Sequence, residues 1–155
     1  MAVIRNLMVT DMVTVAPEDA VVVAVDRMRR NRVGAVLVVD HGELLGLFSE
    51  RDLLNRVVGE RRDPKITKVG QVSTGTLATI DVEQPLKDVL SIFRSGRFRH
   101  LPVLENSKPV GILSTRDFLG MLVDGLERYI DEVRYRRELS DGIDVYDHLG
   151  GAYGS

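Results

Sequence analysis

The chain has 155 residues, 44% of them hydrophobic and 28% charged, which is typical of a soluble globular protein with one domain or two small ones. The formal net charge of −2 argues against a general nucleic-acid-binding protein, because such proteins carry a basic excess. The absence of cysteine excludes disulfide bonds, a thiolate nucleophile and a cysteine-based zinc site.

No apolar run approaches the roughly 20 residues that a membrane span needs. The first residues, MAVIRNLMV, are too short and too interrupted for a secretory signal. We therefore expect a cytoplasmic protein without membrane contact. The three histidines, His41, His100 and His148, lie too far apart along the chain to predict a metal site.

The first predicted elements form the order β-α-β-β-α. A short strand is expected at 13–15, followed by a helix with Asp19 as its N-cap. Two strands are expected at 35–40 and 43–49, joined by a short turn, and a second helix opens at Ser49. The first helix is predicted from the one-face spacing of Val21, Ala24, Val25 and Met28.

The same order repeats after a shift of 65 positions, from Ile4 against Val69 to Leu54 against Leu119. GLFSERDLL (46–54) and GILSTRDFL (111–119) share Gly, Ser, Arg, Asp and the final Leu. In the second copy Pro85 is expected at the first helical position. Its strands are expected at 78–80, 101–105 and 109–114, with a second helix from Ser114.

One copy of about 50 residues has too little core to be stable alone. We therefore expect an α/β (α+β) fold in which two β-α-β-β-α repeats pack about a pseudo-twofold axis and leave two related clefts. The predicted domains are repeat 1 at 4–58, a linker at 59–68, repeat 2 at 69–123 and a C-terminal helical extension with a tail at 124–155.

The last predicted helix runs past the second repeat and carries an apolar stripe that ends at RYRRE (134–138). Packing within the chain or in a dimer is favoured for this stripe, with a regulated protein partner as the alternative. The terminal residues 148–155 are expected to be mobile. The stripe consists of Leu119, Leu122, Val123, Leu126, Ile130 and Val133.

Taken together, these motifs resemble a tandem pair of CBS domains, the unit called a Bateman module. The resemblance covers residues 4–123 and rests on the runs 14–40 and 97–105 and on the paired G-x-x-S-x-R-D endings at 46–52 and 111–117. It implies clefts for adenosine-containing ligands, namely AMP, ADP or ATP, with S-adenosylmethionine and NAD as secondary alternatives. It also implies a regulatory role without an obligatory cofactor, and pairing of two modules into a homodimer.

Each Ser-x-x-Asp box, Ser49 to Asp52 and Ser114 to Asp117, allows two interpretations. As a capping box, the serine and the acid satisfy free N–H groups at a helix start. The resemblance implies that the aspartate accepts hydrogen bonds from the two ribose hydroxyls, for which a carboxylate has enough acceptors. The two interpretations are compatible, because a helix N-terminus at a cleft also favours phosphate.

Cationic residues near these boxes suggest an anionic ligand. Arg51 and Arg116 lie in the first turn of a helix, where a cation opposes the helix dipole. Arg99 and His100 stand where the first copy has Gly34 and a small alanine. Arginine offers a planar fork to phosphate oxygens, and histidine adds a donor. The alternatives are solvated or salt-bridged arginines and a hydrogen-bonded core histidine.

We expect two mixed sites, each combining the box of one copy with the first strand and the strand entry of the other. The first site is predicted from Ser49, Asp52, Thr79, Ile80, Phe98 and Leu101. The second is predicted from Ser114, Asp117, Thr14, Val15, Val33 and Ala35. The remaining candidate ligand-binding residues are Arg51, Arg99, His100, Pro102, Thr115 and Arg116.

Three function classes follow from this reading. The leading one is a non-catalytic module that binds an adenosine ligand and signals to a partner by conformational change. The alternative is a structural or interaction dimer with vestigial clefts that uses its C-terminal helix. An enzyme is disfavoured, because the sequence has no P-loop, GxGxxG run, triad signature or metal-ligand cluster.

Overall fold

The fold is known from a computed structural model that describes residues 3–75 and 78–140. The predicted mobile tail at 148–155 lies outside the described residues. The chain divides after Thr115 into a first unit, which contains both predicted repeats up to the end of the last strand, and a second unit, which contains the long C-terminal helix.

The first repeat contains all the predicted elements. Its helices and strands are α1 (Val3–Leu7), β1 (Thr14–Val15), α2 (Val21–Asn31), β2 (Ala35–Asp40), β3 (Glu43–Ser49) and α3 (Glu50–Asp52), which continues as a π-helical segment, η1 (Leu53–Val58). The predicted bounds of β2 and β3 are confirmed. The short helix α1 was not predicted.

The second repeat follows the same order. Its elements are α4 (Val69–Val72), β4 (Ile80–Asp81), α5 (Leu86–Arg94), β5 (His100–Glu105), β6 (Lys108–Ser114) and α6 (Thr115–Ser140). As in the first repeat, the leading short helix, here α4, was not predicted, because four residues are too few to show a helical period.

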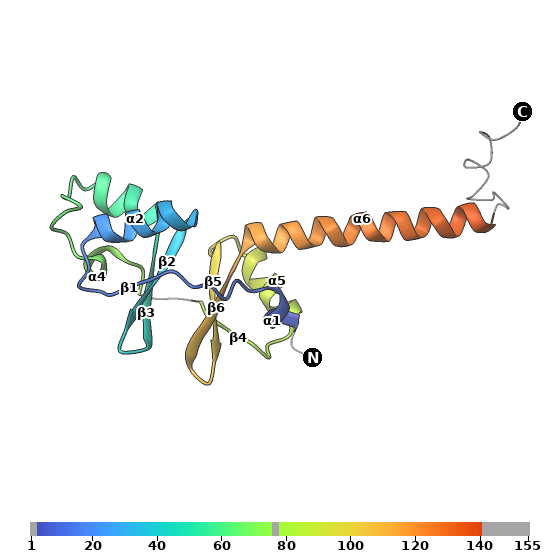
Figure 1. Cartoon of the computed structure of the whole chain (residues 1–155), viewed down its shortest axis with the longest axis horizontal. Coiled ribbons are helices and arrows are strands. Elements are labelled where there is room, and N and C mark those ends of the chain that lie inside the picture. The colour runs from blue at the N-terminus through green and yellow to red at the C-terminus, as the bar shows by residue number, and fades with distance from the viewer. Residues whose placement is uncertain (1–2, 76–77, 141–155) are drawn as a thin grey trace, which may run out of the picture. The chain divides into compact units, whose positions relative to one another are not determined.

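Each repeat forms one three-stranded sheet, shown in Figure 1. β1 pairs with β2 in parallel and β2 pairs with β3 antiparallel, and β4, β5 and β6 repeat this arrangement. The antiparallel register shifts between Val38 and Val39 in one sheet and between Val103 and Leu104 in the other. These positions correspond in the duplication, so the repeats share even their irregularities.

The predicted helix starts are wrong by one residue. The N-cap of α2 is Ala20 and that of α5 is Pro85, both in extended backbone without a side-chain cap. Asp19 does not cap α2; its carboxylate accepts a hydrogen bond from the Ala16 N–H at 2.9 Å, one turn of chain earlier. The fixed φ of proline suits the N-cap position as well as the first helical position, so the pattern alone did not separate the two.

The two cores exchange their leading helices. Ile4 of α1 is fully buried in the core of the second repeat, among Ile80, Val89 and Leu113. Conversely, Val69 and Val72 of α4 are buried in the core of the first repeat. Each repeat therefore completes its core with the segment that begins the other copy in the sequence.

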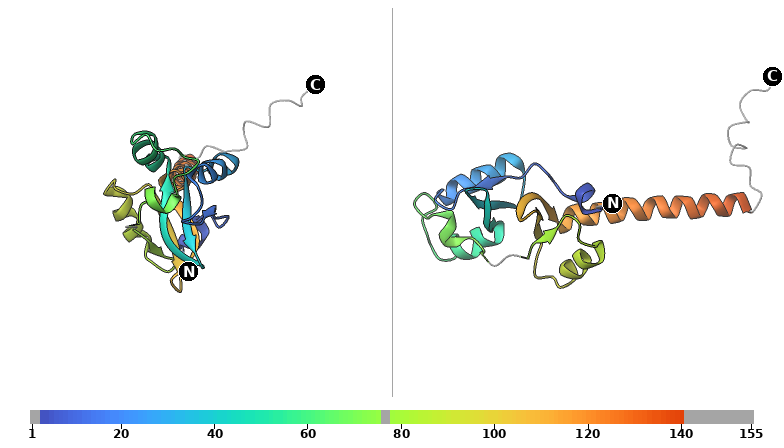
Figure 2. Two further views of the ribbon diagram at one scale, coloured as in Figure 1. Left: turned by 90° about the vertical axis from the view of Figure 1, so that its left-hand side faces the viewer. Right: turned by 90° about the horizontal axis from the view of Figure 1, so that it is seen from below.

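A third apolar cluster joins the two sheets. Ala35, Leu37 and Leu47 of the first sheet are buried there, with Ile112 of β6 packed against them. β3 and β6 lie side by side in Figure 1 and again in the right-hand view of Figure 2. The predicted burial of one sheet against the other is thus confirmed.

The second unit is dominated by α6, whose helix runs from Thr115 to Ser140. The predicted apolar stripe lies on this helix, and its members are between 46% and 60% exposed. No helix among the described residues is long and apolar enough to cross a membrane.

Candidate functional site

The first Ser-x-x-Asp box adopts the capping geometry. Ser49 ends β3 in extended backbone, and its hydroxyl accepts a hydrogen bond from the Asp52 N–H at 3.4 Å. In return, Oδ2 of Asp52 accepts from the Ser49 N–H at 3.0 Å and from the Ser49 hydroxyl at 3.1 Å. The capping interpretation is therefore confirmed for this box.

The second carboxylate oxygen of Asp52 contacts residues that the sequence pattern did not single out. Oδ1 accepts a hydrogen bond from the hydroxyl of Thr74 at 3.1 Å and lies 3.6 Å from Nε of Arg56. Asp52 is only 5% exposed. Both oxygens of this buried carboxylate thus have partners within the protein, as a buried charge requires. We call Ser49, Asp52, Arg56 and Thr74 the Asp52 cluster.

The Asp52 cluster holds residues 73–74, which precede the strands of the second repeat, against β3. Thr74 forms a two-way backbone pair with Leu47 of β3, with N–O distances of 2.9 and 3.0 Å. Arg56 also donates to the carbonyl oxygen of Ser73 at 2.9 Å. A Cβ atom on Gly46 would lie 2.7 Å from the Thr74 carbonyl oxygen, so the approach of this segment to β3 requires glycine there.

The missed residues left only a weak signal in the sequence. Arg56 lies four positions after Asp52, the spacing of an ion pair on one helical face. Thr74 lies much further along the chain, and only the tertiary pairing with β3 brings it to the carboxylate.

The second box lies at the division between the two units. Ser114 is the last residue of β6, and Asp117 lies in the first turn of α6 with an exposed side chain. Thr115 donates its N–H to the Arg99 carbonyl oxygen at 2.9 Å, and Arg116 is exposed. The predicted second site combines residues of both units and stays a prediction.

The residues predicted from the first strands separate into core and surface positions. Val15 and Ile80 are 2% and 1% exposed and belong to the two cores. Thr14 is half-buried, and its carbonyl oxygen accepts a hydrogen bond from Arg27. Thr79 is exposed just before β4.

The charged stretch before β5 alternates between surface and interior. Arg97 and Arg99 are exposed, whereas Phe98 and His100 are half-buried, and Leu101 and Pro102 are buried. Phe98 and Leu101 pack with Ile80 in the second core. Within the described parts of the chain, no carboxylate forms an ion pair with either arginine.

The corresponding stretch of the first repeat has an acidic neighbour instead. Gly34 accepts a backbone hydrogen bond from Glu50 at 3.0 Å, and a Cβ added to Gly34 would lie 3.5 Å from the Glu50 carboxylate. Val33 is half-buried beside the first core, and Ala35 is 5% exposed in the cluster that joins the sheets. Arg32, the counterpart of Arg97, is exposed in this stretch, but Gly34 and Ala35 provide no cation at the positions of Arg99 and His100.

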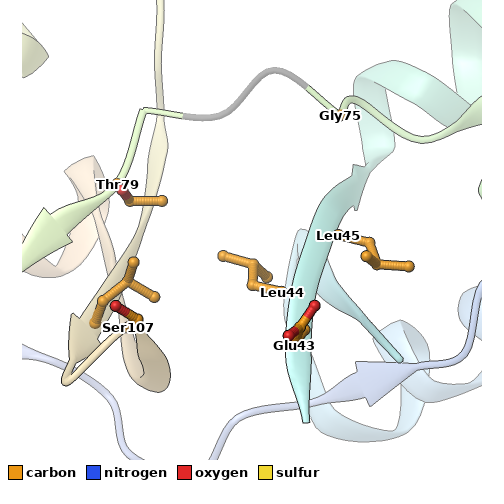
Figure 3. Close-up of a pocket in the computed structure, with 7 residues that line it drawn as sticks. Glu43, Leu44, Leu45, Gly75, Thr79 and Ser107 are labelled. Carbon is orange, nitrogen blue, oxygen red and sulfur yellow. The ribbon is translucent and has the colours of Figure 1, made fainter. Parts of the chain in front are cut away.

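A groove of about 420 Å³ lies between the start of β3 and the strands of the second repeat, as Figure 3 shows. Thr79 is the one predicted ligand-binding residue among those that line it. The others are Glu43, Leu44, Leu45, Gly75, Leu104 and Ser107. The groove is therefore distinct from the set of residues that the motifs predicted.

No group of histidine, aspartate and glutamate side chains suited to a metal ion occurs among the residues that the structure describes. Arg51 is exposed at the start of the helix after β3. Of the predicted residues, the structure brings together Ser49 and Asp52 in one cluster, Ile80, Phe98 and Leu101 in the second core, and Val15 and Val33 in the first core.

Comparison with known proteins adds to this geometry. A family model described as CBS domain matches residues 4–59 and again 69–124. The mitochondrial CBS domain-containing protein CBSX3 of Arabidopsis thaliana is 33% identical over 111 residues, which cover 68% of this chain and 54% of that protein. The chain therefore spans about half the length of this relative.

Two solved structures have the same fold. An uncharacterized conserved protein from Pyrococcus horikoshii is 30% identical, with a TM-score of 0.70 over 76% of this chain and 89% of that one. A hexameric CBS-CP12 protein from bloom-forming cyanobacteria is 24% identical, with a TM-score of 0.68 over 90% of this chain and 84% of that one. The second likeness concerns the fold alone.

Proposed function

Because the chain belongs to the CBS-domain family and carries two copies in tandem, we propose that it is a non-catalytic regulatory module that binds an adenine nucleotide. Tandem CBS domains are regulatory units that often bind adenosine ligands. AMP, ADP and ATP are the proposed ligands. The box aspartates would accept hydrogen bonds from the ribose, since a carboxylate can accept both hydroxyls of a vicinal diol.

The observation that carries the choice of a phosphorylated ligand is the acid-free stretch from Arg94 to His100. It contains three arginines and one histidine in seven residues, and Arg97 and Arg99 expose their side chains. Exposed guanidinium groups without a carboxylate partner are suited to bidentate contacts with phosphate oxygens. The same stretch disfavours S-adenosylmethionine, whose sulfonium group is a cation.

Signalling would follow from a difference in nucleotide affinity between two arrangements of the module. A ligand shifts such an equilibrium only by its preference for one arrangement. The proposal therefore requires that nucleotide binding changes the arrangement of the module in addition to raising its stability.

Thermal unfolding with a panel of AMP, ADP, ATP, NAD and S-adenosylmethionine tests the proposal. A nucleotide at 100 times its Kd is expected to stabilise the protein by about 2.7 kcal/mol. Arg99→Gln should reduce the shift given by ATP, whereas Arg30→Gln, an exposed arginine on α2 without an ion pair among the described residues, should not. If no nucleotide at millimolar concentration moves the melting curve, the proposal is wrong.

A second candidate function, a dimer that interacts through α6, is supported by the apolar stripe on this helix. Leu119, Leu126 and Ile130 are 60%, 59% and 54% exposed, and they follow the spacing of one helical face. Exposed apolar residues gathered on one face are typical of an interaction surface. A second copy of this helix is the proposed occupant, because an identical stripe offers a matching apolar face.

Sedimentation of the full chain tests this candidate. The native chain is expected to form a dimer, and Leu126→Glu should shift it to monomer by placing a charge within the stripe. Glu127→Gln, the adjacent residue on the polar side of α6, is the matched control and should leave the dimer unchanged. A monomeric native chain, or a dimer that survives Leu126→Glu, would contradict the candidate.

A further inference from the structure

The two Ser-x-x-Asp boxes differ in the residues at the positions that correspond to Thr74 and Arg56, although the sequence around them is duplicated. Two isolated bridges, Leu47 with Thr74 and Val9 with Ile112, correspond to each other after the shift of 65 positions. Thr74 therefore stands where the other repeat has Val9. By the same shift, Arg56 stands where the other repeat has Met121. Both polar partners of Asp52 are thus apolar residues at the corresponding positions.

We propose that Thr74 and Arg56 determine the ligand affinity of the first box, because they occupy the Asp52 carboxylate and a nucleotide binds there only by displacing them. This inference rests on the proposed function. It goes beyond that function by assigning an affinity-determining role to two residues outside the family motif and by making the two boxes unequal.

The acceptor capacity of the carboxylate supports this role. A carboxylate has about four lone-pair positions. The Ser49 N–H and hydroxyl use Oδ2, the hydroxyl of Thr74 uses Oδ1, and Arg56 lies 3.6 Å from the same Oδ1 atom. A ribose diol needs two acceptors at once, so the Thr74 hydroxyl must leave. Asp52 is only 5% exposed, so these partners cover its carboxylate together with the surrounding chain.

Displacement of Thr74 would reach beyond the carboxylate. Thr74 is also held by its backbone pair with Leu47, and Arg56 holds the carbonyl oxygen of Ser73. The hydrogen-bonded Asp52 carboxylate therefore holds residues 73–74 against β3, directly after α4. A nucleotide that binds Asp52 in place of Thr74 weakens this attachment. The attachment of residues 73–74 to β3 then indicates whether the first box is occupied.

Calorimetric titration of the full chain with ATP tests the assignment. Thr74→Val and Arg56→Met give the first box the residues that the second repeat carries. Thr74→Val should tighten the weaker binding step about tenfold, the size of one charge-assisted hydrogen bond. Arg56→Met should tighten it less, because the Arg56 side chain is 46% exposed and lies 3.6 Å from Oδ1 without a hydrogen bond to it. Thr10→Val and Arg30→Met are matched controls at exposed positions and should leave the titration unchanged. Adding Asp52→Asn to Thr74→Val should remove the gain.

Hydrogen exchange at two backbone amides gives an independent readout. The N–H groups of Leu47 and Thr74 bond to each other's carbonyl oxygens, so their exchange reports the attachment directly. Saturation of the native chain with ATP should speed exchange at both amides several-fold. The amides of Val9 and Ile112, the corresponding pair, serve as the internal reference.

The outcomes separate this inference from the proposed function. If ATP binds but the Thr74→Val and Arg56→Met titrations match that of the native chain, the inference is overturned and the proposed function stands. A gain that persists in the Asp52→Asn, Thr74→Val double variant also overturns it, because the gain then arises elsewhere. If no nucleotide binds the native chain or any variant, both fail together.

Discussion

The two repeats of the chain share a backbone and differ in their polar contacts. Their sheets have the same strand order, the same hydrogen-bond register and the same register shift in the β-hairpin. The first repeat nevertheless holds its box aspartate in a cluster with Arg56 and Thr74, whereas the second repeat has Met121 and Val9 at those positions. The second repeat instead carries Arg99 and His100 at the positions where the first has Gly34 and Ala35.

This difference shows which features of a duplicated fold are constrained by packing. Apolar positions and close backbone approaches must persist in both copies, because each core needs them. Polar side chains outside the cores are free to diverge, because core packing does not fix them. Differences between the repeats therefore point to function more directly than their similarities, and each substitution below tests one such difference.

The largest expected effect concerns the cores. Phe48 is fully buried in the first repeat, and its counterpart Leu113 is fully buried in the second. Phe48→Ala should lower the free energy of unfolding by about 4 kcal/mol and Leu113→Ala by about 3 kcal/mol, measured by urea denaturation. Because the two cores exchange helices, both variants should still unfold in a single transition. Two separate transitions would show that the repeats are independent.

The next effect concerns the close approach at β3. In Gly46→Ala the new Cβ would meet the backbone carbonyl of Thr74 at 2.7 Å, so the connector must move, at a cost of about 3 kcal/mol in unfolding free energy. Gly111→Ala is the counterpart. There the nearest atom is the flexible Met8 side chain, and the Val9 carbonyl oxygen lies at 3.0 Å, so the loss should be smaller. Thermal or urea unfolding measures both losses of unfolding free energy. Equal losses for Gly46→Ala and Gly111→Ala would contradict this expectation.

A smaller effect is expected at the box aspartate. Asp52→Ala removes the carboxylate that accepts from the Ser49 N–H in the capping box and leaves the Thr74 hydroxyl without its partner, which should cost about 2 kcal/mol of unfolding free energy. Arg51→Ala, the neighbouring exposed residue, should change stability by less than about 0.5 kcal/mol. A loss for Asp52→Ala as small as that control would mean that the cluster contributes nothing to folding.

The smallest effect concerns the hairpin turns. Both residues at each turn have positive φ, with His41 and Gly42 in one hairpin and Asn106 and Ser107 in the other. Serine is strained at a φ of 65°, so Ser107→Gly should raise the unfolding free energy by about 1 kcal/mol, and the reverse change Gly42→Ser should lower it by a similar amount. Melting temperatures that move in the same direction for both variants would contradict this expectation.

The sequence predicts the backbone of this protein better than its site. The apolar runs of β2 and β3 and the apolar spacing of α2 are local signals, and each of them occurs in both copies of the duplication. The unpredicted helices α1 and α4 are too short to show a period, and their apolar residues are buried only by the other repeat. The core role of Val15 and Ile80 could be predicted, because β-branched residues in a short strand are typically buried.

The Asp52 cluster shows why the site is harder to predict. The serine and aspartate are local partners at a fixed spacing, so the capping box could be predicted from four residues. Thr74 joins them through a backbone pair with β3, a contact that no local pattern encodes. The same applies to Glu50 beside Gly34, which the strand pattern alone did not indicate.

The exchange of α1 and α4 between the cores has a consequence for biosynthesis. A chain that leaves the ribosome cannot close its first core before residue 72 has emerged, because Val69 and Val72 belong to it. Ile4, which is made before the rest of the module, has no core to enter until the strands up to Leu113 are available. Folding thus depends on contacts between residues far apart in the module, which slows folding. Removal of residues 1–8 should destabilise the second repeat, because Ile4 belongs to its core.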